Sequence, residues 1–134
     1  MPALSKEQRT FLERATLQYA QHLDEAQGVL EARGLEMGHA RSNGLGVVRN
    51  PLPGHEQHEG KLCIPYLTDA GPINLTFRCM KDHDHEGHGK YVREKGFPGN
   101  LYGVQSIAVA DEWIVVTEGE IDRLIMTQIG IPAL

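Results

Sequence analysis

The chain has 134 residues and a formal net charge of -5 at pH 7, a length that suits one compact unit with a modest core. The acidic balance argues against broad nonspecific affinity for nucleic acid, so any such contact has to come from a local basic patch or from a partner. No run of about 18 apolar residues occurs and the N-terminus has no basic-then-apolar signal pattern, so we expect a cytoplasmic protein that does not span a membrane.

The first part of the chain predicts two helices with structural roles. Ser5 with Gln8 three residues later is typical of a capping box at a helix start. Asp24 with Gln27 predicts the start of a second helix, and Gly34 predicts its end. The expected inward faces repeat at helical spacing and consist of Phe11, Leu12, Ala15, Tyr19 and Leu23 in the first helix and Ala26, Val29 and Leu30 in the second.

A hairpin is predicted in the middle of the chain, after a less regular region that holds a short strand at 45–48 and a polar loop at 51–60. Its strands are 62–67 and 73–79, joined by a turn at 69–72.

Residues alternate along the second strand of the hairpin, which places Arg78 on the face opposite Phe77. Two interpretations of Arg78 follow: a solvated charge, or a phosphate contact, since the guanidinium fork suits phosphate oxygens. Cys63 and Cys79 fall in the adjacent strands, and in a reducing compartment we expect small core residues rather than a disulfide.

The segment after the hairpin is rich in histidine and acidic residues. His83, His85 and His88 have a spacing that a loop could fold around zinc, because imidazole is a ligand that zinc prefers. The segment has no cysteine pair and contains glycine, which favours an ordinary polar surface loop. We therefore expect no zinc site.

Basic residues beside an aromatic ring follow directly. Lys90, Tyr91, Arg93 and Lys95 form a local positive cluster, which is either an ordinary charged surface or a phosphate-binding patch. Leu101-Tyr102-Gly103 then leads into a predicted turn and short helix at 104–110.

The last part of the chain predicts a strand, a glycine turn and a helix. The apolar, β-branched run 113–117 is typical of a strand covered on both faces. Glu118 follows it, Gly119 permits a sharp turn, and Glu120 and Asp122 fall in the first turn of the next helix, where the helix dipole favours negative charge. The inward face is expected to consist of Ile121, Leu124, Ile125, Gln128 and Ile129, with Gly130 ending the helix and a second strand beginning after it. Ligands of open α/β sheets bind beyond the carboxyl ends of the strands, so Glu118 is placed where a metal ion or a phosphate would bind. The alternative is that Glu118 and Asp122 are ordinary acidic residues at a helix N-terminus, with no ligand.

These pieces together resemble a known family. The Glu118–Asp122 motif, Glu-Gly-Glu-Ile-Asp after Ile-Val-Val-Thr, resembles the first motif of the topoisomerase-primase (TOPRIM) domain. Upstream, the runs 62–66, 71–78, 90–91 and 101–103 occur in the order seen in the RNA polymerase core of DnaG-type DNA primases, and the opening helices are similar as well. The resemblance covers nearly the whole chain.

The resemblance implies an α+β fold in which two N-terminal helices and a small antiparallel sheet precede an incomplete α/β strand–helix unit. Residues 1–110 would be the N-terminal subdomain of a primase core and residues 111–134 the start of a TOPRIM domain. The cysteine-rich zinc module that usually precedes such a core does not occur in this chain.

The resemblance also implies a chemistry, metal-dependent nucleotidyl transfer in RNA primer synthesis for DNA replication. Glu118 would be the catalytic glutamate, Glu118 and Asp122 would contribute to a Mg²⁺ (or Mn²⁺) site, and Arg78, Lys90, Tyr91, Arg93 and Lys95 would contact single-stranded DNA template or nucleotides. Lys90 matches the family's Lys-Tyr pair directly, whereas Arg93 and Lys95 match only loosely.

A lone glutamate holds Mg²⁺ poorly, because Mg²⁺ relies on several oxygens. No Asp-x-Asp pair like the family's later one follows Glu118 in this sequence, so we expect the chain alone to be inactive. It would be either a split product that needs a second polypeptide with further TOPRIM strands, or a truncated fragment. The alternatives are a non-catalytic interaction protein that binds a replication partner on a primase-like scaffold, and a small metal-binding module built on the histidine segment.

Overall fold

The computed structural model describes residues 4–81, 91–94, 97 and 101–134. In chain order the helices are α1 (Lys6–Ala20), the 3₁₀ turn η1 (Leu23–Ala26), α2 (Gln27–Ala32), α3 (Met37–Ser42), the 3₁₀ turn η2 (Glu56–His58), α4 (Gln105–Val109) and α5 (Glu120–Gln128). The strands are β1 (Gly46–Val47), β2 (Leu62–Thr68), β3 (Gly71–Arg78) and β4 (Tyr91–Arg93). The predicted α+β class is confirmed.

The four strands form one antiparallel sheet in the order β1-β2-β3-β4. The β2–β3 hairpin is its longest part and occurs where the alternating pattern predicted it, with Asp69 and Ala70 in the turn. β4 adds to the outer edge of β3, so that Arg93 lies opposite Thr76 and Tyr91 opposite Arg78.

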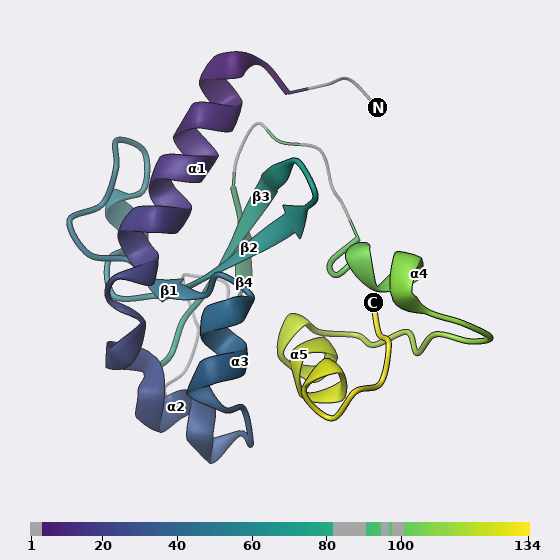
Figure 1. Cartoon of the computed structure of the whole chain (residues 1–134). Coiled ribbons are helices and arrows are strands. Elements are labelled where there is room, and N and C mark those ends of the chain that lie inside the picture. Colours follow the sequence, from purple (N-terminus) through teal and green to yellow (C-terminus); the bar gives the residue numbers. More distant parts are fainter. Residues whose placement is uncertain (1–3, 82–90, 95–96, 98–100) are drawn as a thin grey trace.

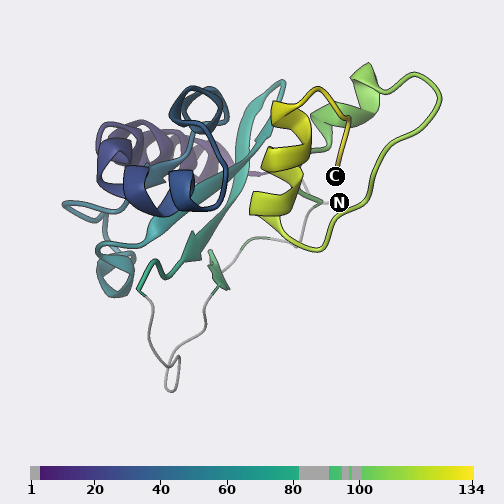
Figure 2. The ribbon, with the colours of Figure 1, turned by 90° about the horizontal axis from the view of Figure 1, so that it is seen from below.

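Apolar side chains cover both faces of the hairpin. One face packs against α1, through Leu12, Ala15 and Tyr19 on the helix and Cys63, Leu75 and Phe77 on the strands. The other face meets α2, α3 and α5, with a core made of Leu23, Ala26, Leu30, Leu35, Ala40, Leu45, Val47, Leu62, Ile64, Tyr66, Tyr102, Ile121 and Leu124. Figures 1 and 2 show α1 and α5 on opposite sides of the hairpin. Both cysteines are buried and free, as expected.

A glycine permits the close approach of α1 to the sheet. A Cβ on Gly46 would lie 2.3 Å from the carbonyl carbon of Tyr19, a distance at which backbone atoms must move. β1 therefore passes directly beneath the end of α1, and this crossing fixes the helix on the sheet.

Some of the predicted helix starts and ends are confirmed and one is wrong. The capping box of Ser5 and Gln8 is present. Gly34 and Gly130 both have positive φ, and each completes a Schellman pair of hydrogen bonds at a helix end. The predicted cap at Asp24 is wrong: Asp24 lies inside η1 and its carboxylate accepts from Arg41, while α2 starts without a side-chain cap. The short helix α3 was not predicted, because its six residues carry no repeating apolar pattern.

The end of the chain differs from its prediction in burial. Residues 115–117 and 132–134 run parallel, joined by backbone hydrogen bonds around the bridge between Val115 and Ala133. The expectation of a strand covered on both faces is wrong, since Trp113 is 60% exposed and Val116 is 76% exposed. Apolar composition predicted full burial, but residues 114, 115 and 117 are only partly buried and the other two are exposed.

Among the residues placed by the structure, no helix has the length and apolar character needed to cross a bilayer.

Candidate nucleotidyl-transfer site

Glu118 lies on the wall of a small hollow of about 150 Å³, which we call the glutamate groove. Its walls come from β2, the end of β4, the segment before α4 and the turn into α5. The lining residues are Tyr66, Arg93, Leu101, Tyr102, Val116, Thr117, Glu118, Gly119, Glu120 and Leu134. The fold therefore brings an arginine and two glutamates, distant in sequence, to one surface hollow.

The two glutamates of the motif differ in their contacts. Glu118 is exposed and precedes Gly119, the N-cap residue of α5. Glu120 is partly buried and accepts a hydrogen bond of 2.5 Å from the hydroxyl of Tyr66. Burial, followed by this hydrogen bond, raises the pKa of Tyr66, so its phenol stays protonated and holds Glu120 in place. Glu118 keeps its oxygens directed to solvent or a ligand.

Asp122 lies on the other side of Glu118. Both residues line a second, more open hollow beside Val116 and Ile125. Asp122 is exposed in the first turn of α5 and does not line the glutamate groove. Its assignment as a metal ligand stays a prediction, as does that of Glu118.

Arg93 is the basic residue that the fold brings to Glu118. It is exposed on β4, and its position opposite Thr76 directs it to the groove wall. The sequence pattern gave Arg93 no more weight than its basic neighbours, because the pairing of β4 with β3 decides its place.

Arg78 lies beneath Tyr91. Its Nε donates to the Tyr91 hydroxyl at 2.9 Å and its guanidinium lies 5.5 Å from the centre of the ring. Arg78 is only 6% exposed, so the interpretation as a solvated charge is wrong. Its assignment to a phosphate stays a prediction, and Tyr91, 40% exposed, covers it.

Two tyrosines form the floor of the groove. The rings of Tyr66 and Tyr102 lie 4.9 Å apart, and burial raises the pKa of Tyr102 although Arg123 opposes the shift. The Tyr102 hydroxyl is buried and has no hydrogen-bond partner within the described part of the chain. Neither tyrosine was predicted as a site residue, because Tyr66 meets Glu120, 54 residues away, and Tyr102 meets the ring of Tyr66, so no local signal marks either one.

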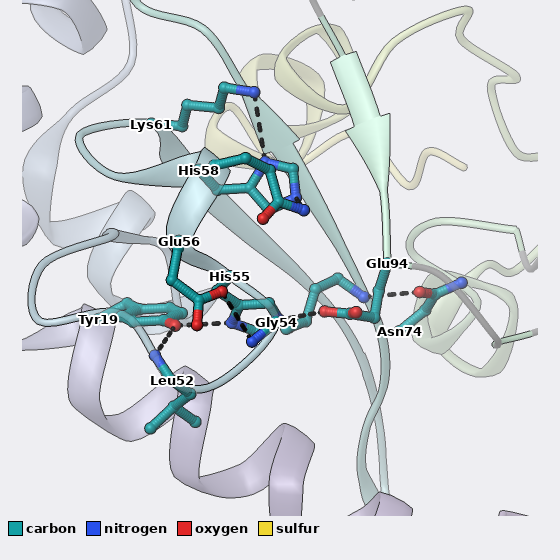
Figure 3. A network of polar contacts seen from close by, with 11 residues as sticks. Tyr19, Leu52, Gly54, His55, Glu56, His58, Lys61, Asn74 and Glu94 are labelled. Atoms are coloured by element: carbon teal, nitrogen blue, oxygen red, sulfur yellow. Dashed lines mark hydrogen bonds and ion pairs between the residues drawn. The ribbon is translucent and has the colours of Figure 1, made fainter.

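A buried network of hydrogen bonds holds Glu94, the residue that follows Arg93. Figure 3 shows Tyr19, His55 and Glu94 in a row, with the Tyr19 hydroxyl 2.6 Å from Nδ1 of His55 and the Glu94 carboxylate against Nε2. The Leu52 amide donates to the same hydroxyl. A carboxylate only accepts, so Nε2 of His55 donates to Glu94 and Nδ1 accepts from Tyr19. Burial raises the pKa of Tyr19 to about 12, which keeps this donor protonated.

His55 and His58 were predicted only as loop residues, yet they are 0% and 4% exposed. His58 stacks on Phe77 with ring centres 4.0 Å apart, and Phe77 meets the edge of His55. The network thus connects α1, the 52–58 segment and the end of β4, and it anchors the strand that carries Arg93.

Several predicted residues fall outside the described part of the chain. They are Lys90 and Lys95 of the basic cluster and His83, His85 and His88 of the zinc hypothesis.

The glutamate groove offers Mg²⁺ one exposed carboxylate. Glu118 offers an exposed carboxylate, whereas Glu120 is committed to Tyr66. Across residues 4–81, 91–94, 97 and 101–134, no three His, Cys, Asp or Glu side chains are grouped to hold a metal ion. Glu118 fits as one ligand of a magnesium site, and further oxygens are required to complete it.

Several solved primase structures have a similar fold. The RNA polymerase domain of Mycobacterium tuberculosis primase DnaG superimposes with a TM-score of 0.73 at 21% identity, over 96% of this chain and 56% of that one. The Aquifex aeolicus primase, with its zinc-binding and RNA polymerase domains, gives a TM-score of 0.76 at 19% identity, over 96% of this chain and 41% of that one. A DnaG primase catalytic domain bound to single-stranded DNA gives 0.68 at 20% identity, over 96% and 56%.

The chain has the fold of DnaG primase catalytic domains. The predicted resemblance to a DnaG-type core is confirmed at the level of fold. The chain spans about half the length of these primase structures. No family model and no curated protein matches the sequence.

Proposed function

We propose that this chain contributes template or nucleotide contacts and the glutamate Glu118 to RNA primer synthesis by a DnaG-like DNA primase. One observation carries the proposal: within a primase-like fold, Glu118 and Arg93 line the same groove. The structures of DnaG domains with single-stranded DNA and with double-stranded DNA oligomers agree with a nucleic-acid ligand.

The residues of the groove have separable tasks in this proposal. The Arg93 guanidinium binds a phosphate of the nucleotide or template, since its planar fork matches phosphate oxygens. Tyr66 holds Glu120 at the groove wall, which leaves Glu118 as the exposed carboxylate. Glu118 is a metal ligand or acts on the attacking 3′ hydroxyl. Mg²⁺ (or Mn²⁺), when bound, would stabilise the charge that develops on the α-phosphate.

The remaining carboxylates come, in this proposal, from further TOPRIM strands on a second polypeptide. Trp113 and Val116 support this, because their exposed side chains flank the groove segment and offer apolar surface to a partner. The same surface also fits a non-catalytic protein that binds a replication partner, and enzyme activity separates the two functions.

The test is primer synthesis on single-stranded DNA with the chain alone, with a polypeptide carrying further TOPRIM strands and their Asp-x-Asp pair, and with both together. We expect Mg²⁺-dependent primers only from the mixture, and at least about 100-fold less with Glu118→Gln. Glu112→Gln is the matched control, because Glu112 is an exposed carboxylate outside the groove. A stable complex without primers would favour the non-catalytic function.

A further inference from the structure

Another groove, further along α5 from the glutamate groove, contains a buried arginine. This groove of about 610 Å³ lies between α3, the β2–β3 turn, α4 and the C-terminal half of α5, and we call it the arginine groove. Figures 1 and 2 show α5 between α3 and α4. Its polar lining residues include His39, Asn43, Asp69, Gln105, Ser106 and Arg123.

Arg123 is 3% exposed and its polar partners are all neutral. Nε donates to the Ala133 carbonyl at 3.1 Å, Nη1 to the Asn43 amide oxygen at 3.2 Å, and Nη2 to the Ser106 hydroxyl at 2.8 Å. The guanidinium also lies 5.2 Å from the centre of the Tyr102 ring. No carboxylate forms an ion pair with it anywhere in the described structure.

A buried guanidinium without an anion is costly, because burial removes the water that would solvate the charge. Arginine has five N–H donors, and the three hydrogen bonds above leave two of them, one on each terminal nitrogen, for a further acceptor. The Ser106 hydroxyl accepts from Arg123, so its own proton is available to a ligand. Three donors are therefore gathered on one wall of the groove.

Two neighbours agree with an unneutralised positive charge. Burial, and after it the charge of Arg123, lowers the pKa of His39, whose Nε2 lies 2.8 Å from the Thr127 hydroxyl. The buried amide oxygen of Gln105 lacks a hydrogen-bond partner among the placed residues. Rotation of this amide by 180° would place its NH₂ group there and add a donor.

We propose that the arginine groove binds the phosphate group of a small molecule, held by Arg123 and Ser106. A tetrahedral oxyanion can offer a separate oxygen to each of the three donors, whereas a carboxylate has two oxygens and would accept two of these hydrogen bonds on one of them. The site is separate from the glutamate groove and does not depend on the function proposed above.

Titration of the purified chain with inorganic phosphate, at ionic strength held constant with chloride, tests the proposal by calorimetry and by backbone amide NMR. We expect a dissociation constant of about 1 mM or tighter, with shifts centred on Ser106 and Arg123. Arg123→Gln should weaken binding at least about tenfold, since a charge-assisted contact is lost. Arg41→Gln is the control: it removes the same charge from α3, where Arg41 pairs with Asp24.

Variants outside the buried arginine keep the test decisive if Arg123→Gln does not fold. Asp69 is an exposed turn residue on the rim, so Asp69→Asn should tighten phosphate binding by about two- to fivefold. Ser106→Ala should weaken it. Phosphate should also raise the pKa of His39, followed by ring NMR, because the anion would neutralise Arg123.

The proposal is overturned if the wild-type chain binds no phosphate at 10-fold the expected dissociation constant of about 1 mM. Unchanged affinity in a folded Arg123→Gln, or in both Asp69→Asn and Ser106→Ala, contradicts it as well. A preference for acetate over phosphate would overturn the assignment to a phosphate group.

Discussion

The hairpin region and the C-terminal region use different forces to hold their shape. Between α1 and β4 the hairpin has apolar cover on both faces, and residues such as Leu12, Phe77 and Ile64 are fully buried. In the region from residue 101 on, Ile121 and Leu124 of α5 belong to the same core. The other contacts of this region include the hydrogen bonds of Arg123 and the backbone hydrogen bonds between residues 115–117 and 132–134.

Exposure follows the same division. Among the residues that the structure describes, six of the eight exposed large hydrophobic side chains belong to the C-terminal region: Leu101, Ile107, Val109, Trp113, Val116 and Ile129. The hairpin region therefore places its apolar side chains in the core, whereas the C-terminal region leaves large apolar side chains exposed.

The largest effect expected from this comparison is on the hairpin core. Phe77→Ala should lower the free energy of unfolding by about 3–5 kcal/mol, because it empties a fully buried site that packs against both His55 and His58. Urea denaturation followed by circular dichroism measures this. Ile107→Ala, at a 56% exposed position, should change the free energy by less than about 0.5 kcal/mol. Similar losses of unfolding free energy in Phe77→Ala and Ile107→Ala would contradict the difference between the two regions.

A smaller effect is expected at the junction of the two regions. Tyr66→Phe removes the hydrogen bond to Glu120 and should cost about 1 kcal/mol of unfolding free energy. Tyr102→Phe is the matched control, because its buried hydroxyl has no partner among the placed residues, and we expect a neutral or slightly stabilising change. If Tyr102→Phe lowers the free energy of unfolding more than Tyr66→Phe does, the stabilising role assigned to the Tyr66–Glu120 hydrogen bond is wrong.

A weaker pH dependence is expected from His39. Its pKa in the folded chain is lowered, by burial first, so the unfolded chain binds the proton more readily. Stability should therefore fall as the pH drops from about 6.5, the ordinary histidine value, towards the lowered value, and this residue should have no effect above that range. Thermal melts across pH 5–8 should show a shallower acid slope for His39→Gln. An unchanged slope would contradict the assignment.

The smallest effect on stability is expected at the exposed apolar surface. Trp113 is 60% exposed, so Trp113→Ala should change the free energy of unfolding by no more than about 0.5 kcal/mol. In the proposed complex the same change should weaken association with the completing polypeptide, measured by calorimetry. A Trp113→Ala variant that is strongly destabilised but associates normally would show that Trp113 contributes to folding and not to association.

Sequence patterns predicted the parts of the fold whose causes are local. The capping box at Ser5, the helix ends at Gly34 and Gly130 and the hairpin strands all depend on neighbours within a few residues. Long-range partners decided the rest. His55 pairs with Tyr19 and Glu94, 36 and 39 residues away, so a loop histidine becomes a core residue without any local sign.

The candidate site divides in the same way. Glu118 was predicted from a contiguous motif, whereas the position of Arg93 depends on the β3–β4 pairing and that of Tyr66 on a contact with α5. The burial of Arg78 under Tyr91 depends on the same pairing. The run 113–117 was predicted to be buried from its apolar residues alone. Its exposure depends on whether another segment covers it, which the residues of the run do not determine.

The most direct test of the central claim is to locate the metal in the proposed complex. Amide NMR of the labelled chain, mixed with the polypeptide that carries further TOPRIM strands, should show Mn²⁺ broadening centred on Gly119, Arg93 and Tyr102. The broadening should disappear with Glu118→Gln and persist with Glu112→Gln. Broadening centred instead on residues 83–88, or broadening that is unchanged by Glu118→Gln, would contradict the assignment of Glu118 to a nucleotidyl-transfer site.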